Sequence, residues 1–471
     1  MNITNLLDNP ILNADSYKTC HFTFMEPGTN RIVAYVSPRV GGEFKTVIHF
    51  GLQSYLIKDL SRVITKEHID QAETFLLAHG EPFNRAGWEL IVNKYNGKLP
   101  LRVRALPEGM RVPAGNATVV VENTDYDNMD EETAAFLATY VETGMLRASW
   151  YGSTVATQSY EMRKILLEFL EETGNPSLIP FGIIDFGARG VSSKESTGIG
   201  GAAHLVAGNY GTDNLLGIAH SMVYYNETEV TGYSIQATEH SVTTARGEKG
   251  ELSFFREVIA KITPTKPASL VIDSYDMNRA IKYIGVDCKE QLLATGGTLR
   301  LRPDSGVPYK VVLSTVKKLD KYFGHTVNAK GYKVLHPSVR VIQGDGITLT
   351  MMRKILQVLK DAGYSADNVN FGSGGFLLQQ VNRDTCRYAM KASYVEVNGV
   401  GKKVNKQPKT DMTKASKGGL LEVVRRDGQI ITIELHEVLP TDELLLEIVF
   451  ENGEVLKTWK FTEARANVMN S

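Results

Sequence analysis

Three short segments of the sequence carry acidic side chains, and two of them also contain a glycine or a cation. They are DSYD, with Asp273 and Asp276, RPDSG, with Arg302 and Asp304, and QGDG, with Gly344 and Asp345. Carboxylates beside glycine backbone suit a Mg²⁺ ion with a polyhydroxy, polyphosphate ligand, because Mg²⁺ prefers hard oxygens and often shares them with substrate phosphates. Each aspartate taken singly has a structural alternative as a turn-forming or helix-capping residue. Several of them on one face would favour the ligand site.

A glycine cluster, GSGG at residues 372–375, follows an apolar run and precedes FLLQQVNRD, which is predicted to be helical. Backbone N–H groups at such a strand-to-helix loop can bind a phosphate. Arg383, two turns into the predicted helix, and Lys391 would add positive charge. The alternative is a tight turn that binds nothing.

Glu239 and His240 lie together in YSIQATEHSVTTARG, between a predicted strand and the start of a helix. A histidine beside a glutamate in an active-site loop can act as an acid, a base or a phosphoryl acceptor. A lone histidine is more often structural. The sequence contains no GxSxG, HExxH or Walker A pattern and no GxGxxG after a strand, which removes the commonest alternative chemistries.

Short apolar runs that end in Gly, Asp, Ser or Arg precede these polar groups. The runs are FGIIDFGARG, ASLVIDSYD, TLRLRPDSG, VRVIQGDG and NVNFGSGG. Apolar spacing predicts helices at residues 154–173, 309–322 and 348–362, the first and last closed by Gly174 and Gly363. Strands alternating with helices imply parallel βα units, whose active sites lie at the carboxyl ends of the strands. We therefore predict an α/β fold with a barrel-like parallel catalytic domain at residues 150–384.

The two flanking regions have a different pattern. Residues 99–122 alternate and turn at Pro107–Gly109 and Pro113–Gly115, as antiparallel strands do. The C-terminal region repeats this pattern, with turns at Asp427-Gly428 and Asn452-Gly453. We predict that residues 1–149 and 385–471 pair into one composite, β-rich α+β domain, with 402–417 as an exposed basic loop.

Composition excludes several classes of protein. The chain has 471 residues, 42% hydrophobic and 22% charged, which is typical of a globular protein and argues against disorder and coiled coils. The net charge of -1 leaves no overall excess of positive charge to bind the phosphate backbone of a nucleic acid. Three cysteines without a CxxC pattern make a disulfide framework or a zinc site improbable. No signal peptide and no run of about 18 apolar residues is found, so a cytoplasmic protein without a membrane segment is expected.

The ordered set of motifs resembles the nicotinamide phosphoribosyltransferases. The densest matches are DFGARGVSSKESTGIGGAAHLV, GTDN, EHSVTTA, DSYD, RPDSG, VIQGDG and FGSGG, and the similarity runs from ILNADSYK to FTEARANV. This resemblance implies a type II phosphoribosyltransferase fold and a homodimer with sites at the subunit interface. It also implies the reaction of nicotinamide with 5-phosphoribosyl 1-diphosphate to give nicotinamide mononucleotide and diphosphate.

The resemblance also assigns roles to residues that bind the base. The nicotinamide ring would stack between Phe186 and a tyrosine of the partner subunit, here Tyr17, an arrangement that suits a flat heterocycle. Asp213 in the GTD motif would accept a hydrogen bond from the carboxamide N–H₂. A carboxylate at this position should repel nicotinate, whose charge has the same sign.

The remaining roles concern the sugar, the phosphates and ATP. Arg189 and Arg302 would contact the 5′-phosphate and sugar region, and Asp304 and Asp273 would serve the ribose, the diphosphate and Mg²⁺. Further ribose and phosphate contacts would be Gly344, Asp345, Gly374, Gly375 and Arg383. The cations for the diphosphate or ATP phosphates, drawn from both subunits, would be Arg39, Lys391 and Lys414.

In the family that the sequence resembles, the histidine that matches His240 is phosphorylated by ATP, which couples ATP hydrolysis to tighter substrate binding. Glu239 would tune this histidine. Two positions depart from the family pattern, since Ala188 stands where animal members have tyrosine and Ala389 replaces a serine that contacts phosphate. Base binding and phosphate affinity are the properties that these departures put in question.

Three alternatives remain open at this point. Nicotinate phosphoribosyltransferase shares the fold and the histidine, although Asp213 argues against it. A barrel lyase or isomerase with a Schiff-base lysine would also explain GSGG, but Lys194 and Lys391 do not end clear strands. A non-enzymatic interaction protein that keeps the fold is the third alternative.

Overall fold

The structure is a computed structural model that describes residues 3–126, 133–410 and 415–471. These residues form two compact units. The first unit combines Met1–Thr157, Met222–Glu227 and Asn382–Ser471, and the second combines Gln158–Ser221 and Thr228–Val381. Helix α6 (Glu142–Thr173) and helix α8 (Leu215–Tyr224) each contribute residues to both units.

The main sheet of the first unit is antiparallel and draws its strands from both ends of the chain. Its strands are β1 (Thr29–Pro38), β3 (Leu101–Ala105), β5 (Val119–Asn123), β15 (Tyr388–Val397), β16 (Val400–Lys403), β20 (Glu447–Glu451) and β21 (Glu454–Val455). They are ordered β16-β15-β1-β5-β3-β20-β21. This interleaving of N-terminal and C-terminal strands confirms the predicted composite β-rich part of the fold.

Smaller elements complete the first unit. Two further sheets contain β2 (Thr46–Ile48) with β4 (Arg111–Pro113), and β17 (Leu421–Arg426) with β18 (Gln429–Glu434) and β19 (Glu443–Leu444). The helices are α1 (Ser16–Thr19), α2 (Leu52–Tyr55), α3 (Lys66–His79), α4 (Arg85–Tyr95), α5 (Leu137–Tyr140) and α16 (Phe461–Asn470). The predicted hairpin turns are confirmed, because Asp427-Gly428 and Asn452-Gly453 both have positive φ at each residue, as tight hairpins require.

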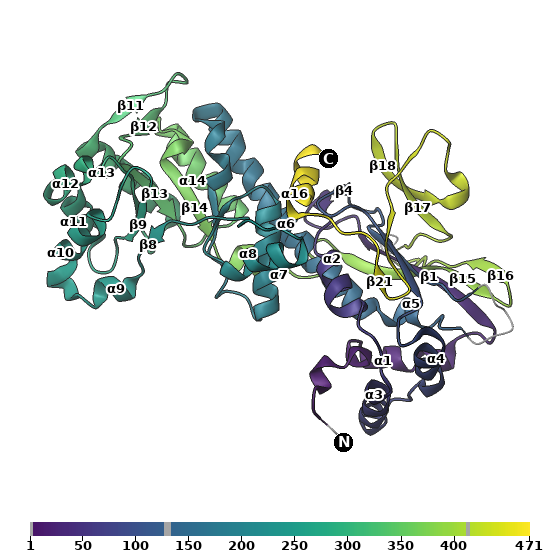
Figure 1. Cartoon of the computed structure of the whole chain (residues 1–471). Helices are drawn as coiled ribbons and strands as arrows, with labels where there is room; N and C mark the ends of the chain where they lie inside the picture. Colours follow the sequence, from purple (N-terminus) through teal and green to yellow (C-terminus); the bar gives the residue numbers. More distant parts are fainter. Residues whose placement is uncertain (1–2, 127–132, 411–414) are drawn as a thin grey trace. The chain divides into compact units, whose positions relative to one another are not determined.

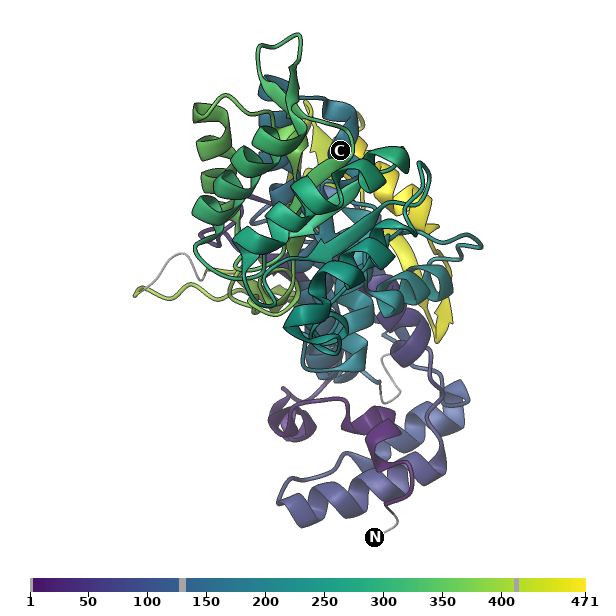
Figure 2. The same ribbon diagram turned by 90° about the vertical axis from the view of Figure 1, so that its left-hand side faces the viewer.

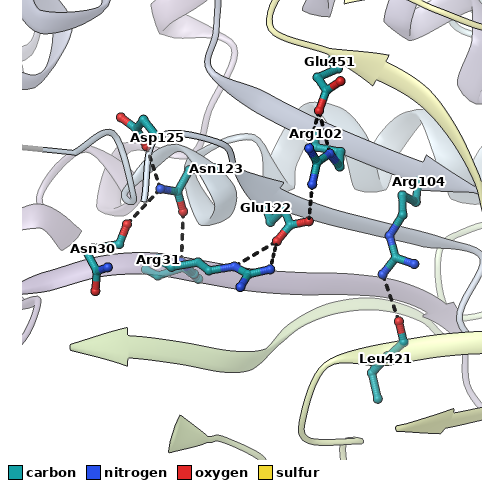
Figure 3. A network of polar contacts seen from close by, with 10 residues as sticks. Asn30, Arg31, Arg102, Arg104, Glu122, Asn123, Asp125, Leu421 and Glu451 are labelled. Carbon is teal, nitrogen blue, oxygen red and sulfur yellow. Dashed lines mark hydrogen bonds and ion pairs between the residues drawn. The ribbon is translucent and has the colours of Figure 1, made fainter. Parts of the chain in front are cut away.

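A ladder of charged side chains crosses the main sheet (Figure 3). Arg31 on β1 and Arg102 on β3 both contact the buried carboxylate of Glu122 on β5. Arg102 Nε also donates to Glu451 on β20 at 2.6 Å. Because these four strands come from both ends of the chain, the ladder ties the N-terminal and C-terminal strands together.

The second unit contains a seven-stranded parallel sheet. Its strands are β6 (Ile183–Asp185), β7 (Gly211–Thr212), β8 (Gln236–Ala237), β9 (Ala268–Val271), β10 (Leu299–Arg302), β13 (Val339–Gln343) and β14 (Val369–Ser373). They are ordered β7-β6-β14-β13-β10-β9-β8. Tyr233, just before β8, forms a parallel bridge with Gly211 of β7, and this contact joins the two edges of the sheet. The barrel-like parallel α/β prediction is therefore confirmed.

Helices surround this sheet (Figure 1). They are α7 (Lys194–Val206), α9 (His240–Thr244), α10 (Gly247–Ile259), α11 (Met277–Lys282), α12 (Lys289–Ala294), α13 (Pro308–Phe323), α14 (Leu349–Asp361) and α15 (Gly375–Leu378). Helix α13 buries Val312, Val316 and Leu319, a spacing of three and four residues that places them on one face. The green β11–β12 hairpin (His325–Val327 and Lys333–Leu335) extends beyond these helices (Figure 2).

Two predicted helices differ from the structure. Helix α6 begins at Glu142, before the predicted start at Thr154. The residues between these two positions include glycines, which lower helix propensity, so the sequence did not indicate this part of the helix. Gly144 is required there, since a Cβ atom would lie 2.6 Å from the Tyr55 hydroxyl. The helix predicted over FLLQQVNRD is wrong beyond Leu378. Asn382 accepts hydrogen bonds from the N–H groups of Asp384 and Thr385, and this local turn replaces the helix.

Among the described residues, no helix has both the length and the apolar character needed to cross a membrane.

Candidate active site

The predicted strand-end residues gather at one edge of the parallel sheet. Phe186 follows β6, Asp213 follows β7, and Glu239 and His240 follow β8. Asp273 follows β9, Asp304 follows β10, Gly344 and Asp345 follow β13, and Gly374 and Gly375 follow β14. Because all seven strands run in the same direction, their carboxyl ends bring residues as distant in sequence as Phe186 and Gly375 to a common face.

The ring of Phe186 packs beside two glycines, Gly372 and Gly344. The backbone N–H of Phe186 donates to Ser373 O at 2.9 Å, which pairs the loop with the end of β14. A Cβ atom at Gly372 would lie 2.1 Å from the Phe186 ring, and one at Gly344 would lie 3.1 Å from it. A side chain at Gly372 would therefore displace the aromatic ring, and glycine at this position lets the ring pack against the neighbouring strand.

Asp213 lines the same cavity as Phe186. Its backbone N–H donates to Asp185 O at 3.0 Å, and its carboxylate accepts a hydrogen bond from the Ser234 hydroxyl. The carboxylate is exposed to the cavity that Phe186 also lines. Ser234 therefore holds one carboxylate oxygen of Asp213 in place while the other remains available to a ligand.

The cavity lies within the second unit and has a volume of about 460 Å³. Ile184, Ile235 and Ile342 form apolar walls between the polar groups. Arg302 also lines the cavity, with its guanidinium carbon 6.0 Å from the centre of the Phe186 ring and its Nη2 donating to Thr238 O at 2.8 Å. Arg300, Arg340 and Asp367 line other parts of the cavity. The part beside Phe186, with apolar side chains, the Asp213 carboxylate and the Arg302 guanidinium, suits a small flat ring that bears a polar substituent.

His240 is held between two aspartates. Its Nε2 lies 3.1 Å from Asp273 Oδ1, and its Nδ1 lies 3.9 Å from Asp304 Oδ2. Asp273 Oδ2 accepts the Asp304 backbone N–H at 3.1 Å, which links the two acidic residues. The side chain of Asp273 is 5% exposed and that of His240 is 43% exposed. The buried carboxylate therefore orients the imidazole, while part of the ring stays accessible to a ligand. The carboxylate of Glu239 accepts a hydrogen bond from the Ser241 hydroxyl.

The loop after β6 and the GSGG loop lie close together. A Cβ atom at Gly190 would be 3.3 Å from both the Cα and the N of Gly375, so the loop after β6 runs close to the GSGG loop. A Cβ atom at Gly375 itself would meet no atom within 4 Å. Arg189, which precedes Gly190 in the loop after β6, is exposed. This open space lined by backbone is the arrangement that a phosphate group requires.

The other predicted residues belong to the first unit. Burial is the main cause that lowers the pKa of both Arg39 and Lys391, and the charge of Arg39 lowers the pKa of Lys391 further. Arg39 Nε donates to Arg387 O at 3.2 Å, and the charges of Arg387 and Arg383 also lower the Arg39 pKa. Repulsion among partly buried cations predicts an anion ligand here.

Tyr17 is exposed, with its ring 5.4 Å from that of His21. Lys414 lies outside the described residues. Arg383 was expected two turns into a helix, but α15 ends at Leu378, so Arg383 belongs with Arg39 and Arg387 in the first unit.

Four residues around the site were missed by sequence reasoning: Asp185, Asn214, Ser234 and Gly372. Gly372 belongs to the GSGG cluster, so its type was visible, but its contact with Phe186 depends on strand pairing. Asp185 and Asn214 stand next to predicted site residues, and their buried hydrogen bond joins positions 29 apart. No periodicity in the sequence signals such a pair.

Known proteins are similar to this chain over most of its length. A sequence profile of the nicotinate phosphoribosyltransferase (NAPRTase) family matches residues 181–443, and the profile of the nicotinamide phosphoribosyltransferase N-terminal domain matches residues 9–103. The chain is 44% identical to the nicotinamide phosphoribosyltransferase of Xanthomonas campestris pv. campestris, over 98% of each chain. It is 32% identical to that of Acinetobacter baylyi, over 95% of this chain and 94% of the relative.

Solved structures share the fold. The nicotinate-nucleotide pyrophosphorylase of Pyrococcus furiosus has a TM-score of 0.64 and 17% identity, with 100% of this chain and 96% of that chain covered. Human nicotinic acid phosphoribosyltransferase has a TM-score of 0.59 and 15% identity, with 97% and 92% covered. The extent of the sequence matches shows that this chain belongs to the nicotinate and nicotinamide phosphoribosyltransferase family and is a phosphoribosyltransferase enzyme.

Proposed function

We propose that the chain transfers the phosphoribosyl group of 5-phosphoribosyl 1-diphosphate to nicotinamide, giving nicotinamide mononucleotide and diphosphate in NAD salvage. The observation that carries this proposal is the Asp213 carboxylate in the cavity walled by Phe186. A carboxylate accepts hydrogen bonds from an amide N–H₂ and repels a carboxylate ligand. The names of the relatives from Xanthomonas campestris and Acinetobacter baylyi support the same substrate.

The base would stack on the face of the Phe186 ring that Gly372 and Gly344 do not cover. Its carboxamide N–H₂ would donate to Asp213, and its carbonyl oxygen would face the Arg302 guanidinium. The Arg302 guanidinium lines the cavity and has several N–H groups, of which Nη2 provides one to Thr238 O, so donors remain for that oxygen. These three groups would fix the ring plane and its rotation before the chemical step.

In the chemical step the pyridine nitrogen is the nucleophile. The bond from this nitrogen to the ribose C1′ forms, the bond from C1′ to the diphosphate oxygen breaks, and the electron pair leaves with the diphosphate. Since positive charge develops on the ribose and negative charge on the leaving group, the strand-end carboxylates and the cations Arg39 and Lys391 would act electrostatically. No covalent enzyme nucleophile is needed.

Mg²⁺ is the proposed cofactor, and the residues present fit it. Asp304 has a carboxylate that is 37% exposed, and Asp273, although bonded to His240 and to the Asp304 N–H, retains acceptor capacity because a carboxylate has about four lone-pair sites. Mg²⁺ commonly takes one or two carboxylates together with substrate phosphates. The ion would neutralise charge on the diphosphate.

ATP is the proposed co-substrate, with His240 as the phosphoryl acceptor. If the imidazole donates its Nε2–H to Asp273, Nδ1 carries the lone pair. Attack by Nδ1 on the γ-phosphorus forms the N–P bond as the P–O bond to ADP breaks. Asp273 would stabilise the positive charge that develops on the ring, as a buried carboxylate does for other catalytic histidines.

We also propose a homodimer with shared sites, as the resemblance to the family implies, in which Tyr17, Arg39 and Lys391 of one subunit would complete the strand-end site of the other subunit. Two variants that should be inactive test it: Lys391→Ala, which removes a cation proposed for the diphosphate, and Asp304→Ala, which removes a proposed Mg²⁺ ligand at the strand ends. When they are mixed, unfolded and refolded together, about one quarter of the wild-type activity should return, because half of the dimers are mixed and one site in each is intact. Each variant refolded alone is the control, and no recovery in the mixture would exclude shared sites.

The test of the proposed function is a product assay. The purified protein is incubated with 5-phosphoribosyl 1-diphosphate, Mg²⁺ and nicotinamide or nicotinate, with and without ATP, and each mononucleotide is quantified. We expect nicotinamide mononucleotide as the preferred product, with more of it when ATP is present. A preference for nicotinate would instead make the chain a nicotinate phosphoribosyltransferase.

A further inference from the structure

A buried carboxylate lies between the two residues that would recognise the base. Asp185, the last residue of β6, is fully buried. Its Oδ1 accepts the Gly187 N–H at 2.7 Å, one residue beyond Phe186, and its Oδ2 accepts Asn214 Nδ2 at 3.0 Å, one residue beyond Asp213. Its backbone oxygen accepts the Asp213 N–H at 3.0 Å. A single residue thus contacts both recognition loops with all three of its oxygens.

These bonds close into a ring. Asn214, also fully buried, donates from Nδ2 to Thr197 O at 2.9 Å on α7, as well as to Asp185. The Thr197 hydroxyl lies 3.3 Å from Ala188 O in the Phe186 loop and 3.0 Å from Ser193 O, and it shares its one proton between these two acceptors. The path from Asp185 through Asn214 and Thr197 to Ala188 returns to the loop that begins at Asp185.

The residue type at 185 also needs an explanation. Burial raises the pKa of Asp185 to about 6, and its carboxylate has two uncharged donors, the Gly187 backbone N–H and the Asn214 amide, so ionising this group inside the protein costs free energy. A neutral asparagine would cost less, but its side chain has one acceptor oxygen and the structure presents two donors. A carboxylate is the side chain of this size that accepts from both loops at once.

We propose that Asp185 is a positioning residue that fixes the Phe186 loop relative to the Asp213 loop, and that this spacing sets the preference for an amide over an acid. The inference rests on the proposed function, because it assumes that Phe186 and Asp213 hold the base. Asp185 touches neither the base nor the ribose. It acts through the two loops that its oxygens hold.

The test is Asp185→Asn, which keeps the size of the side chain and removes one acceptor. We expect the KM for nicotinamide to rise about tenfold or more, while kcat and the KM for 5-phosphoribosyl 1-diphosphate change by less than about threefold, since a displacement of about 1 Å weakens oriented binding strongly. The ratio of kcat/KM for nicotinamide to that for nicotinate should fall about tenfold. This ratio does not depend on the fraction of folded enzyme, so partial unfolding leaves it interpretable.

Two further variants separate positioning from other effects. Thr197→Val opens the same ring without changing charge, and it should lower the ratio in the same direction by a smaller factor. Asn368→Asp is the matched control, because Asn368 is a fully buried amide that bonds Leu335 N, Lys333 O and Ser365 O in the same unit. It should lower thermal stability and leave the ratio unchanged.

The outcomes are distinguishable. A wild-type enzyme without preference for nicotinamide would overturn the proposed function, and the inference with it. A wild-type preference that Asp185→Asn and Thr197→Val both retain would overturn the inference alone, and Asp185 would then serve only stability. A ratio that falls in Asp185→Asn but not in Thr197→Val would assign the effect to the lost negative charge and would also contradict positioning.

Discussion

Asp213→Asn should lower the preference for nicotinamide over nicotinate by a factor on the order of 10² to 10³. Two unit charges about 4 Å apart repel by about 4 kcal/mol at an effective dielectric constant near 20, which sets the upper end of this range. Asparagine removes the repulsion, and its Nδ2 can donate to the nicotinate carboxylate. Ser234 can still donate to the remaining oxygen, so the loop should keep its conformation.

The measurement is kcat/KM for both bases with wild type and variant at one pH and one ionic strength. We expect most of the change as a gain with nicotinate, together with a rise of about tenfold in the KM for nicotinamide, because a hydrogen bond to a charged acceptor is lost. Asp361→Asn is a suitable control, since it removes one exposed carboxylate at the end of α14. An unchanged ratio in Asp213→Asn would show that another group selects the base.

His240→Ala should abolish the stimulation of the enzyme by ATP and retain transfer without ATP within about threefold of wild type. The pyridine nitrogen attacks the ribose carbon directly, so the imidazole is not required for that bond to form. The phosphoryl group, in contrast, has no other acceptor in the proposed scheme. Rates with and without ATP, measured on the same preparation, separate the two contributions.

Labelling with ATP that carries ³²P at the γ-position gives a second readout. Wild type should acquire an acid-labile, base-stable label, as a phosphohistidine does, and His240→Ala should acquire none. His325→Ala is the matched control, because His325 also bonds an aspartate, with its Nδ1 2.6 Å from Asp320 Oδ1, but lies on the β11–β12 hairpin. Full ATP stimulation in His240→Ala would refute the phosphohistidine.

The local pattern of the sequence was enough to predict the architecture and the side of the sheet on which the site lies. Apolar runs that end in polar residues, alternating with amphipathic helices, require parallel strands, and parallel strands place those polar ends together. Asp273, Asp304 and His240 meet for this reason. The turns at Asp427-Gly428 and Asn452-Gly453 were equally local, because positive φ restricts the residue type.

The roles of Phe186, Asp213 and His240 came from resemblance to a family, since stacking and amide recognition have no periodicity. The residues that hold them were visible only in the tertiary structure. Gly372 lies beneath Phe186 because β6 and β14 are neighbours in the sheet, although they are far apart in the chain. Sequence spacing cannot indicate this order of strands, because it follows from hydrogen bonding between distant segments.

The same limit explains why the helix predicted over residues 379–383 is wrong. The apolar spacing of FLLQQVNRD fits a helix, but the Asn382 side chain provides an alternative set of backbone hydrogen bonds, and Arg383 consequently joins Arg39 in the first unit. The Asp185–Asn214 bond is a further example, in which two buried polar groups satisfy each other across 29 positions. Types and spacing thus determined which chemistry gathers at the strand ends, and long-range packing decided the geometry in which each group is held.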